Sequence, residues 1–317
     1  MAESGASRVP RVLTDPTTGR RIDLYATQAA NRRASGALFA LLAGLLVLIG
    51  WALALAFDPS AAGLFVGVAL VVAGVQSGVA WAFSDKIALA AAGARKASRE
   101  EQRYLVNVSE AVAIGAGVPP PRVFVIDDPA PNAFATGRDP SRAAIAVTTG
   151  LLERLDRQEL EGVIAHEMAH VRNYDIRFLS FLAATVGAIV VLRDLVLRWM
   201  RFGRRRSGGG GGRGQVFALV AVLVLLILAP IMATLLHFAV SRRREYLADA
   251  TAAYITRNPE GLASALERLR DYRGAPLAAS EGVRHMFIVN PILRLNARGW
   301  WSTHPPIDDR IDRLRRM

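Results

Sequence analysis

Four long apolar runs interrupt an otherwise polar chain. They are Gly36–Phe57, Ala61–Phe83, Ile176–Leu192 and Gln215–Val240. A transmembrane helix needs about 20 apolar residues, and the apolar core of a cleavable signal peptide is shorter and closer to the start of the chain. The pattern therefore predicts a mainly α, multi-pass membrane protein with about four transmembrane helices.

Basic residues predict how these helices are oriented. Residues 1–35 are polar and rich in arginine, whereas the turn at Asp58 has no basic residue. Cytoplasmic flanks carry the excess of Lys and Arg, so 1–35 is predicted to be a cytoplasmic tail and 36–83 a transmembrane hairpin. The Arg/Gly-rich loop 193–214 conflicts with this rule if the third and fourth runs both span the membrane. We expect two crossings within 176–240, and a hairpin lying in the cytoplasmic interface is the alternative.

The remaining polar parts predict one discontinuous cytoplasmic domain, made of 84–175 and 241–317. Short apolar runs bounded by turn residues predict three strands, at Arg122–Ile126, Asn132–Gly137 and Ala143–Thr148. Helix-start signals predict helices that begin near Asp156, Asn258 and Ile307. The expected fold of this domain is α+β with a small β-sheet.

The helix near Asp156 carries the sequence His166-Glu167-Met168-Ala169-His170. Positions i and i+4 share a face of a helix, so His166 and His170 can hold one metal ion together. Glu167 adds a carboxylate that can take a proton from metal-bound water, as hydrolytic zinc sites require. The simpler alternative is a helix that carries two histidines and no metal.

Composition limits the other ligands. The chain has 317 residues, a hydrophobic fraction of 52%, a net charge of +12, five histidines and no cysteine. A zinc site without thiolates must use His, Asp or Glu. Glu245 is the preferred third ligand because it lies just outside the fourth apolar run, and Asp249, one turn later, is spaced to orient a ligand histidine. Alternatively, both carboxylates only offset Arg242–Arg244.

In a membrane protein the positive net charge favours contact with the lipid bilayer over contact with nucleic acid.

Four segments together resemble the HtpX-like membrane zinc metalloproteases, which are relatives of the CAAX prenyl endopeptidases. They are HEMAHVRNYD (166–175), SRRREYLAD (241–249), PNAFATG (131–137) and STHPP (302–306). The resemblance implies a zincin-like fold and a gluzincin site with one Zn²⁺ per chain. It assigns His166, His170 and Glu245 as ligands, Glu167 as the catalytic base and Asp249 as the residue that orients a histidine.

The resemblance also implies a substrate-binding edge strand at Asn132, Ala133 and Phe134. An exposed edge strand can pair with an extended peptide through backbone hydrogen bonds. The alternative for Asn132 is only a turn before a strand. His304 either donates a hydrogen bond to the developing oxyanion, as the resemblance suggests, or only caps the final helix.

These features predict a membrane-embedded zinc endopeptidase whose active site faces the cytoplasm. By resemblance its polypeptide substrates would be damaged or misfolded membrane proteins, and the composition suggests a bacterial inner membrane. A narrow processing protease of the CAAX type and a scaffold with a structural zinc site are the alternatives. Glu167 argues against the scaffold, because a structural site has no use for a base beside its ligands. No nucleic-acid partner is predicted.

Overall fold

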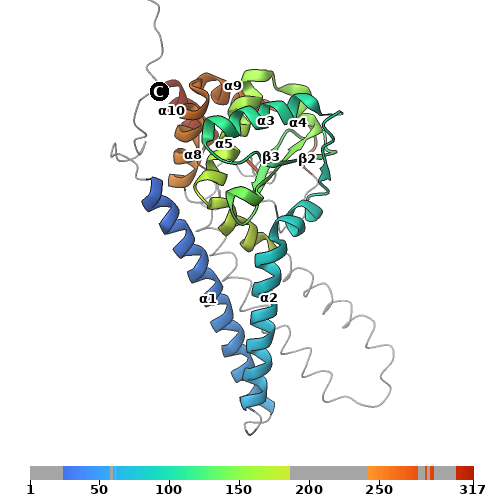
Figure 1. Ribbon diagram of the computed structural model, residues 1–317, viewed down its shortest axis with the longest axis vertical. Coiled ribbons are helices and arrows are strands. Elements are labelled where there is room, and N and C mark those ends of the chain that lie inside the picture. The colour runs from blue at the N-terminus through green and yellow to red at the C-terminus, as the bar shows by residue number, and fades with distance from the viewer. Residues whose placement is uncertain are drawn as a thin grey trace, which may run out of the picture.

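The structure, a computed structural model, describes residues 24–57, 60, 62–100, 102–185, 242–277, 283, 286–288 and 305–317. Two long helices extend from a globular part that is mostly helical and contains a small mixed sheet (Figure 1). The predicted tail 1–35 is described from Leu24, where it is already helical. The third apolar run is described, as helix, to Thr185. The loop 193–214, the fourth apolar run and His304 lie outside the described residues.

The two long helices, α1 (Leu24–Phe57) and α2 (Ala62–Ala91), lie side by side (Figure 1). Within the described residues, α2 is the helix that is long and apolar enough to cross a membrane. Its large apolar side chains point outward, with Leu64 69%, Val71 66% and Val75 61% exposed. Water disfavours so continuous an apolar surface, and lipid accommodates it.

Helix α2 ends at Ala91 and not at Phe83, where the predicted span ends. Its last turns, beyond the predicted span, are buried against the sheet through Ala88 and Leu89. The Asp85 carboxylate accepts a hydrogen bond from Arg122 of the sheet. One continuous helix therefore belongs to both the long hairpin and the globular part.

The sheet has four strands, β1 (Arg95–Lys96), β2 (Arg122–Ile126), β3 (Ala133–Thr136) and β4 (Ala144–Thr148). Their spatial order is β1-β2-β4-β3. β2 and β4 are parallel, and the two outer pairs are antiparallel. The three predicted strands are present, whereas β1 is too short for its alternation to be recognised. β3 is an edge strand, as the resemblance implies, but it is not exposed, because all four of its residues are buried.

The sheet is the middle layer of three. One face packs against α3 (Arg103–Ala116), α5 (Arg157–Arg172) and α9 (Pro259–Asp271). The other face packs against the end of α2 and Phe287. Side chains alternate between the faces, as the pleat requires: Val125 and Val147 lie on the first, and Ile126 and Ala146 on the second. Between β3 and α5 the chain forms η2 (Pro140–Arg142), β4 and α4 (Thr149–Arg154).

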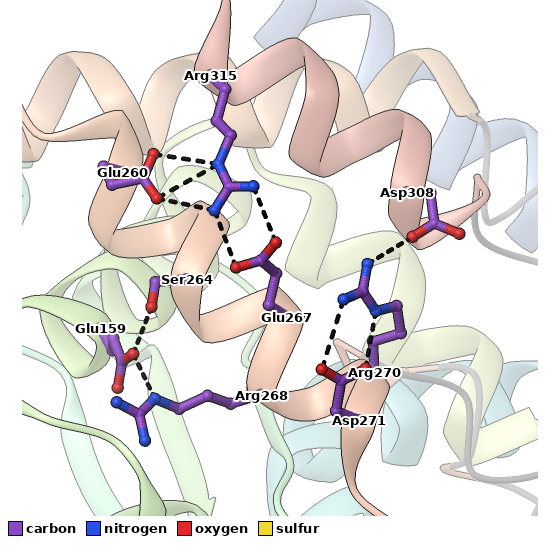
Figure 2. A network of polar contacts seen from close by, with 9 residues as sticks. All are labelled: Glu159, Glu260, Ser264, Glu267, Arg268, Arg270, Asp271, Asp308 and Arg315. Atoms are coloured by element: carbon purple, nitrogen blue, oxygen red, sulfur yellow. Dashed lines mark hydrogen bonds and ion pairs between the residues drawn. The ribbon is translucent and has the colours of Figure 1, made fainter.

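Two further helices, α8 (Arg242–Thr256) and α10 (Ile307–Arg315), complete the helical layer. Figure 2 shows the ion pairs that join α10 to α9. Arg315 is bidentate to both Glu260 and Glu267, and Arg270 contacts Asp308. These side chains are partly exposed, so solvent weakens each pair. They join α9 to α10, which carries a residue of the site.

Helix α5 begins with the predicted capping box. The Asp156 carboxylate accepts hydrogen bonds from the backbone of Gln158 and Glu159, and the Glu159 carboxylate accepts one from the backbone of Asp156. Glu159 also accepts hydrogen bonds from Ser264 and Arg268 of α9 (Figure 2). The same carboxylate therefore starts α5 and ties it to the neighbouring helix.

Helices α5 and α9 cross in backbone contact at two glycines. A Cβ on Gly162 would lie 2.6 Å from the Leu262 nitrogen, and one on Gly261 would lie 2.6 Å from the Gln158 carbonyl oxygen.

Gly162→Ala is therefore expected to destabilise the protein by about 1–3 kcal/mol, because α9 has to move away from α5. Thermal unfolding in detergent measures this effect. Gly36→Ala is the control, since a Cβ there meets nothing within 4 Å. Equal unfolding midpoints for the two variants would contradict the close crossing.

Candidate metal centre

Helix α5 places the two histidines of the motif together inside the protein. His166 and His170 are 1% and 7% exposed. Their Nε2 atoms are 3.3 Å apart. Leu160, Val163 and Ile164 of the same helix are fully buried in the core. The helical spacing brings the rings together, and the apolar side of α5 fixes the direction in which they point.

Helix α8 brings Glu245 to the same point. Its two carboxylate oxygens lie 3.7 Å from His166 Nε2 and 3.7 Å from His170 Nε2. The three candidate ligand atoms all lie within 4.8 Å of one another, and all three residues are buried. Residues that are 75 positions apart in the sequence (245 − 170) therefore meet because α5 and α8 pack side by side.

Each histidine has a carboxylate behind it. His166 Nδ1 lies 2.9 Å from Asp249 Oδ1, and His170 Nδ1 lies 3.1 Å from Asp175 Oδ2. A carboxylate is only an acceptor, so each Nδ1 carries a proton, and the neutral form of each ring presents the lone pair of its Nε2 atom. Asp249 thus lies where the sequence places a histidine-orienting residue, whereas Asp175 is an additional one.

The donor set fits a zinc ion. Two Nε2 lone pairs and a carboxylate converge on one buried point. These electron-rich groups repel one another unless a cation or a proton lies between them. Two nitrogens at zinc–nitrogen distances of about 2.0–2.1 Å and at a tetrahedral angle are about 3.3–3.4 Å apart, and the observed separation is 3.3 Å. Three ligands leave the fourth position for water, as in catalytic zinc sites.

Arg310 of α10 is a site residue that the sequence reading missed. It is 1% exposed and forms a bidentate ion pair with Asp249, at 2.9 Å from Nε and 2.7 Å from one terminal nitrogen. Its other terminal nitrogen lies 3.7 Å from Glu245. A signal was present, because Arg310 falls on the buried stripe of α10 that Ile311 and Leu314 define. A charged residue on an apolar stripe indicates a buried partner.

The electrostatics of the centre keep the Asp249 carboxylate charged behind His166. Burial alone would raise the pKa of Asp249, but the charge of Arg310 and the hydrogen bond with His166 lower it. Burial alone would lower the pKa of His170, but the hydrogen bond to Asp175 and the charge of Glu245 raise it to about 9. Burial lowers the pKa of His166. The centre without a metal therefore holds a proton near His170, which a bound cation displaces.

Glu167 lies between the ligands and the edge of the sheet. Burial raises its pKa to about 7, and a backbone hydrogen bond from Ala135 of β3 opposes that rise. A general base works best when its pKa is near the working pH. The Glu167 carboxylate is therefore suited to take up and release a proton, and it does so beside an edge strand.

The expected substrate strand lies next to Glu167. The Ala133 carbonyl at its open edge accepts a hydrogen bond of 3.0 Å from the Ile288 backbone. Asn132 is 3% exposed; its backbone is bonded to Thr148, and its side-chain oxygen accepts from the Ala133 backbone. Phe134 points to the other face of the sheet, where its ring stacks edge-on against Phe287 at 4.9 Å. The edge is thus beside the centre, and the chain itself covers part of it.

Comparisons with known proteins identify a family of peptidases. A family model described as Peptidase family M48 matches residues 99–317. A protein of Caldanaerobacter subterraneus subsp. tengcongensis named Protease HtpX homolog is 44% identical, over 93% of this chain and 98% of that relative. A protein of the same name from Dictyoglomus thermophilum is 44% identical, over 92% of this chain and 94% of that relative. Another from Tropheryma whipplei is 46% identical, over 81% of this chain and 88% of that relative. The solved structure of S. mikatae Ste24p covers 92% of this chain and 66% of its own, at 18% identity and a TM-score of 0.47, a likeness too remote to support an argument.

Proposed function

Because this chain belongs to peptidase family M48, we propose that His166, His170 and Glu245 hold its zinc ion and that Glu167 is its catalytic base. The chain is a membrane zinc metalloprotease that acts on polypeptides. The observation that supports these assignments is the convergence of three buried acceptor groups within 4.8 Å, with a fourth carboxylate beside them.

Glu167 moves the protons of the reaction. A bound zinc ion supplies a Lewis acid that polarises the scissile carbonyl and makes water more acidic. The Glu167 carboxylate takes a proton from the attacking water and delivers it to the leaving amine as the peptide bond breaks. Its position between the ligand set and β3 suits both transfers. His304 is assigned as a donor to the developing oxyanion, which rests on the resemblance of its motif.

The outer edge of β3, which Ile288 partly covers, is the proposed substrate-binding edge. An extended peptide pairs with the outer side of the segment that contains Asn132–Phe134, which gives affinity with little sequence preference. Ala133 and Ala135 are the residues whose backbone groups point away from β4, toward Ile288 and Glu167. A peptide in that register lies across the face of Glu167. For the pairing to form, Ile288 has to give up its hydrogen bond to Ala133.

The membrane arrangement that we propose has four spans. α1 and α2 form the first hairpin, and 176–240 form the second. The protease domain consists of 84–175 and 241–317, and it faces the cytoplasm of a bacterial cell, because Arg32 and Arg33 lie just before the apolar part of α1 and Lys86 near the end of α2. Substrates that are damaged membrane proteins suit an active site held at the membrane surface, and this places the enzyme in membrane-protein quality control.

Removal of the metal tests the function. The full chain, purified in detergent without chelator, is expected to cleave unfolded casein, to stop when a chelator is added and to recover with Zn²⁺. Glu245→Ala is expected to lose most bound zinc and all measurable cleavage, because two histidines are too few to hold the ion tightly. Glu153→Ala is the matched control, since Glu153 is on the surface of α4 with its side chain 73% exposed. Full zinc content in Glu245→Ala would exclude Glu245 as a ligand, and cleavage that survives the chelator would exclude the metalloprotease mechanism.

A further inference from the structure

We propose that Asn31 on α1 is a positioning residue of the metal centre, which holds Asp175 against His170 so that α1 sets the affinity of the site for a divalent cation. This inference rests on the proposed function of His170 as a ligand. A continuous chain of polar contacts carries it. Asn31 Nδ2 lies 2.7 Å from Asp175 Oδ1, and Asp175 Oδ2 lies 3.1 Å from His170 Nδ1.

Every residue of this chain of contacts is buried. Asn31 is 8% exposed, Asp175 2% and His170 7%. Water therefore does not replace a missing donor at little cost, as it does at a surface. The same amide of Asn31 also donates to the Asn173 carbonyl at 2.8 Å. One side chain of α1 thus binds both the backbone and the carboxylate of the segment that follows α5.

The segment 172–175 needs contacts from another element to keep its conformation. α5 ends at Arg172, and Tyr174 has a φ of +62°, a left-handed conformation that is uncommon for a residue with a bulky side chain. This turn folds the chain back so that Asp175 meets His170 of the preceding helix. Strained turns persist only where the surroundings fix them. If the turn relaxed, Asp175 would move away from the imidazole.

The first turns of α1 make these contacts. In addition to Asn31, the Gln28 amide donates to the Arg172 carbonyl at 3.0 Å, and the Arg32 guanidinium lies 4.2 Å from the centre of the Tyr174 ring. Three successive contacts of α1 therefore bind 172–175. Of these, Asn31 is the one that reaches the carboxylate behind a ligand.

The two halves of the centre are built alike. Asp249 orients His166 and is held by Arg310 from α10, whereas Asp175 orients His170 and is held by Asn31 from α1. In both cases a distant element supplies the donor that fixes the carboxylate. Loss of a partner behind a ligand histidine typically weakens metal binding by about 10–100-fold. Asn31 is one contact further from the metal, so we expect a smaller effect.

Zinc affinity of the full chain in detergent tests the inference, by competition with a chromophoric chelator. Asn31→Leu keeps the approximate volume and removes both hydrogen bonds, and it is expected to weaken zinc binding by about 3–10-fold. Arg33→Leu introduces the same side chain two positions later at an exposed site of α1, and it is expected to bind zinc as the wild type does. If Asn31→Leu does not fold, Asn31→Ser, which is too short to reach Asp175, takes its place.

A double variant shows whether Asn31 acts through Asp175. Asp175→Asn alone is expected to weaken zinc binding more than Asn31→Leu, and Asn31→Leu/Asp175→Asn no more than Asp175→Asn alone, because the effects of coupled residues do not add. The visible spectrum of the Co²⁺-loaded protein should shift in Asn31→Leu and not in Arg33→Leu. Wild-type affinity in Asn31→Leu, or additive effects in the double variant, would overturn the inference. Absence of zinc binding in the wild type would overturn the proposed function itself.

Discussion

Glu167→Gln is expected to lower kcat/KM for peptide hydrolysis by about 10²–10⁴-fold and to leave zinc binding intact. The amide has the shape of the carboxylate and can still accept the backbone hydrogen bond from Ala135, so the local structure is preserved. It cannot take a proton from water. Because Glu167 is not one of the three converging acceptors, the ion keeps its ligands. Steady-state cleavage of a fluorogenic unfolded substrate, with zinc content measured on the same sample, gives both quantities.

Glu161→Gln is the control for this prediction. Glu161 lies earlier on α5 and pairs with Arg157 at the surface. Its substitution by Gln is the same chemical change outside the centre. Its activity should match the wild type. If Glu167→Gln retained activity within about twofold, the proton would have to be taken by another group, and the assignment of Glu167 as base would be wrong.

Arg310→Met is expected to destabilise the protein by about 3–5 kcal/mol, because it leaves the Asp249 carboxylate buried and without its cation. Asp249 is 2% exposed, so the charge cannot turn to water. Asp249 also fixes His166, and zinc binding should weaken together with stability. Thermal unfolding of the metal-free protein separates the two effects, and the midpoint is expected to fall by at least about 6 °C.

A second substitution distinguishes an uncompensated charge from lost packing. Arg310→Met/Asp249→Asn removes the charge and keeps an oxygen that can accept the His166 proton, so part of the stability should return. Arg316→Met, at the exposed residue that follows α10, is expected to behave as the wild type does. A double variant that is less stable than Arg310→Met would contradict the ion pair as the cause.

Local signals predict the parts of the centre that one element carries. The spacing of His166 and His170 within α5 requires only helical geometry, and the capping box of Asp156 and Glu159 is a local pattern that the structure contains. The three longer strands follow from their apolar runs and turns. The length of α2 does not, because the apolar run ends at Phe83 and the helix continues to Ala91 where its last turns pack against the sheet.

Contacts between distant parts of the chain cannot be predicted in this way. Arg310 and Asp249 are 61 residues apart, and Asn31 and Asp175 are 144 residues apart. The periodicity of α1 or α10 predicts that a polar residue is buried and therefore needs a partner. It does not identify that partner. Glu245 and Asp249 were predicted from the spacing of α8, and their meeting with the histidines depends on how α5 and α8 pack.

The order of the site residues along the chain delays completion of the centre during synthesis. Asn31 comes first, the histidines follow, and Glu245 comes 75 residues after His170. At translation rates of about 5–20 residues per second, roughly 4–15 s separate the emergence of the second histidine from that of Glu245. Arg310, which holds Asp249, is added later still. A ribosome-bound chain thus carries an incomplete metal site until first Glu245 and then Arg310 have been synthesised.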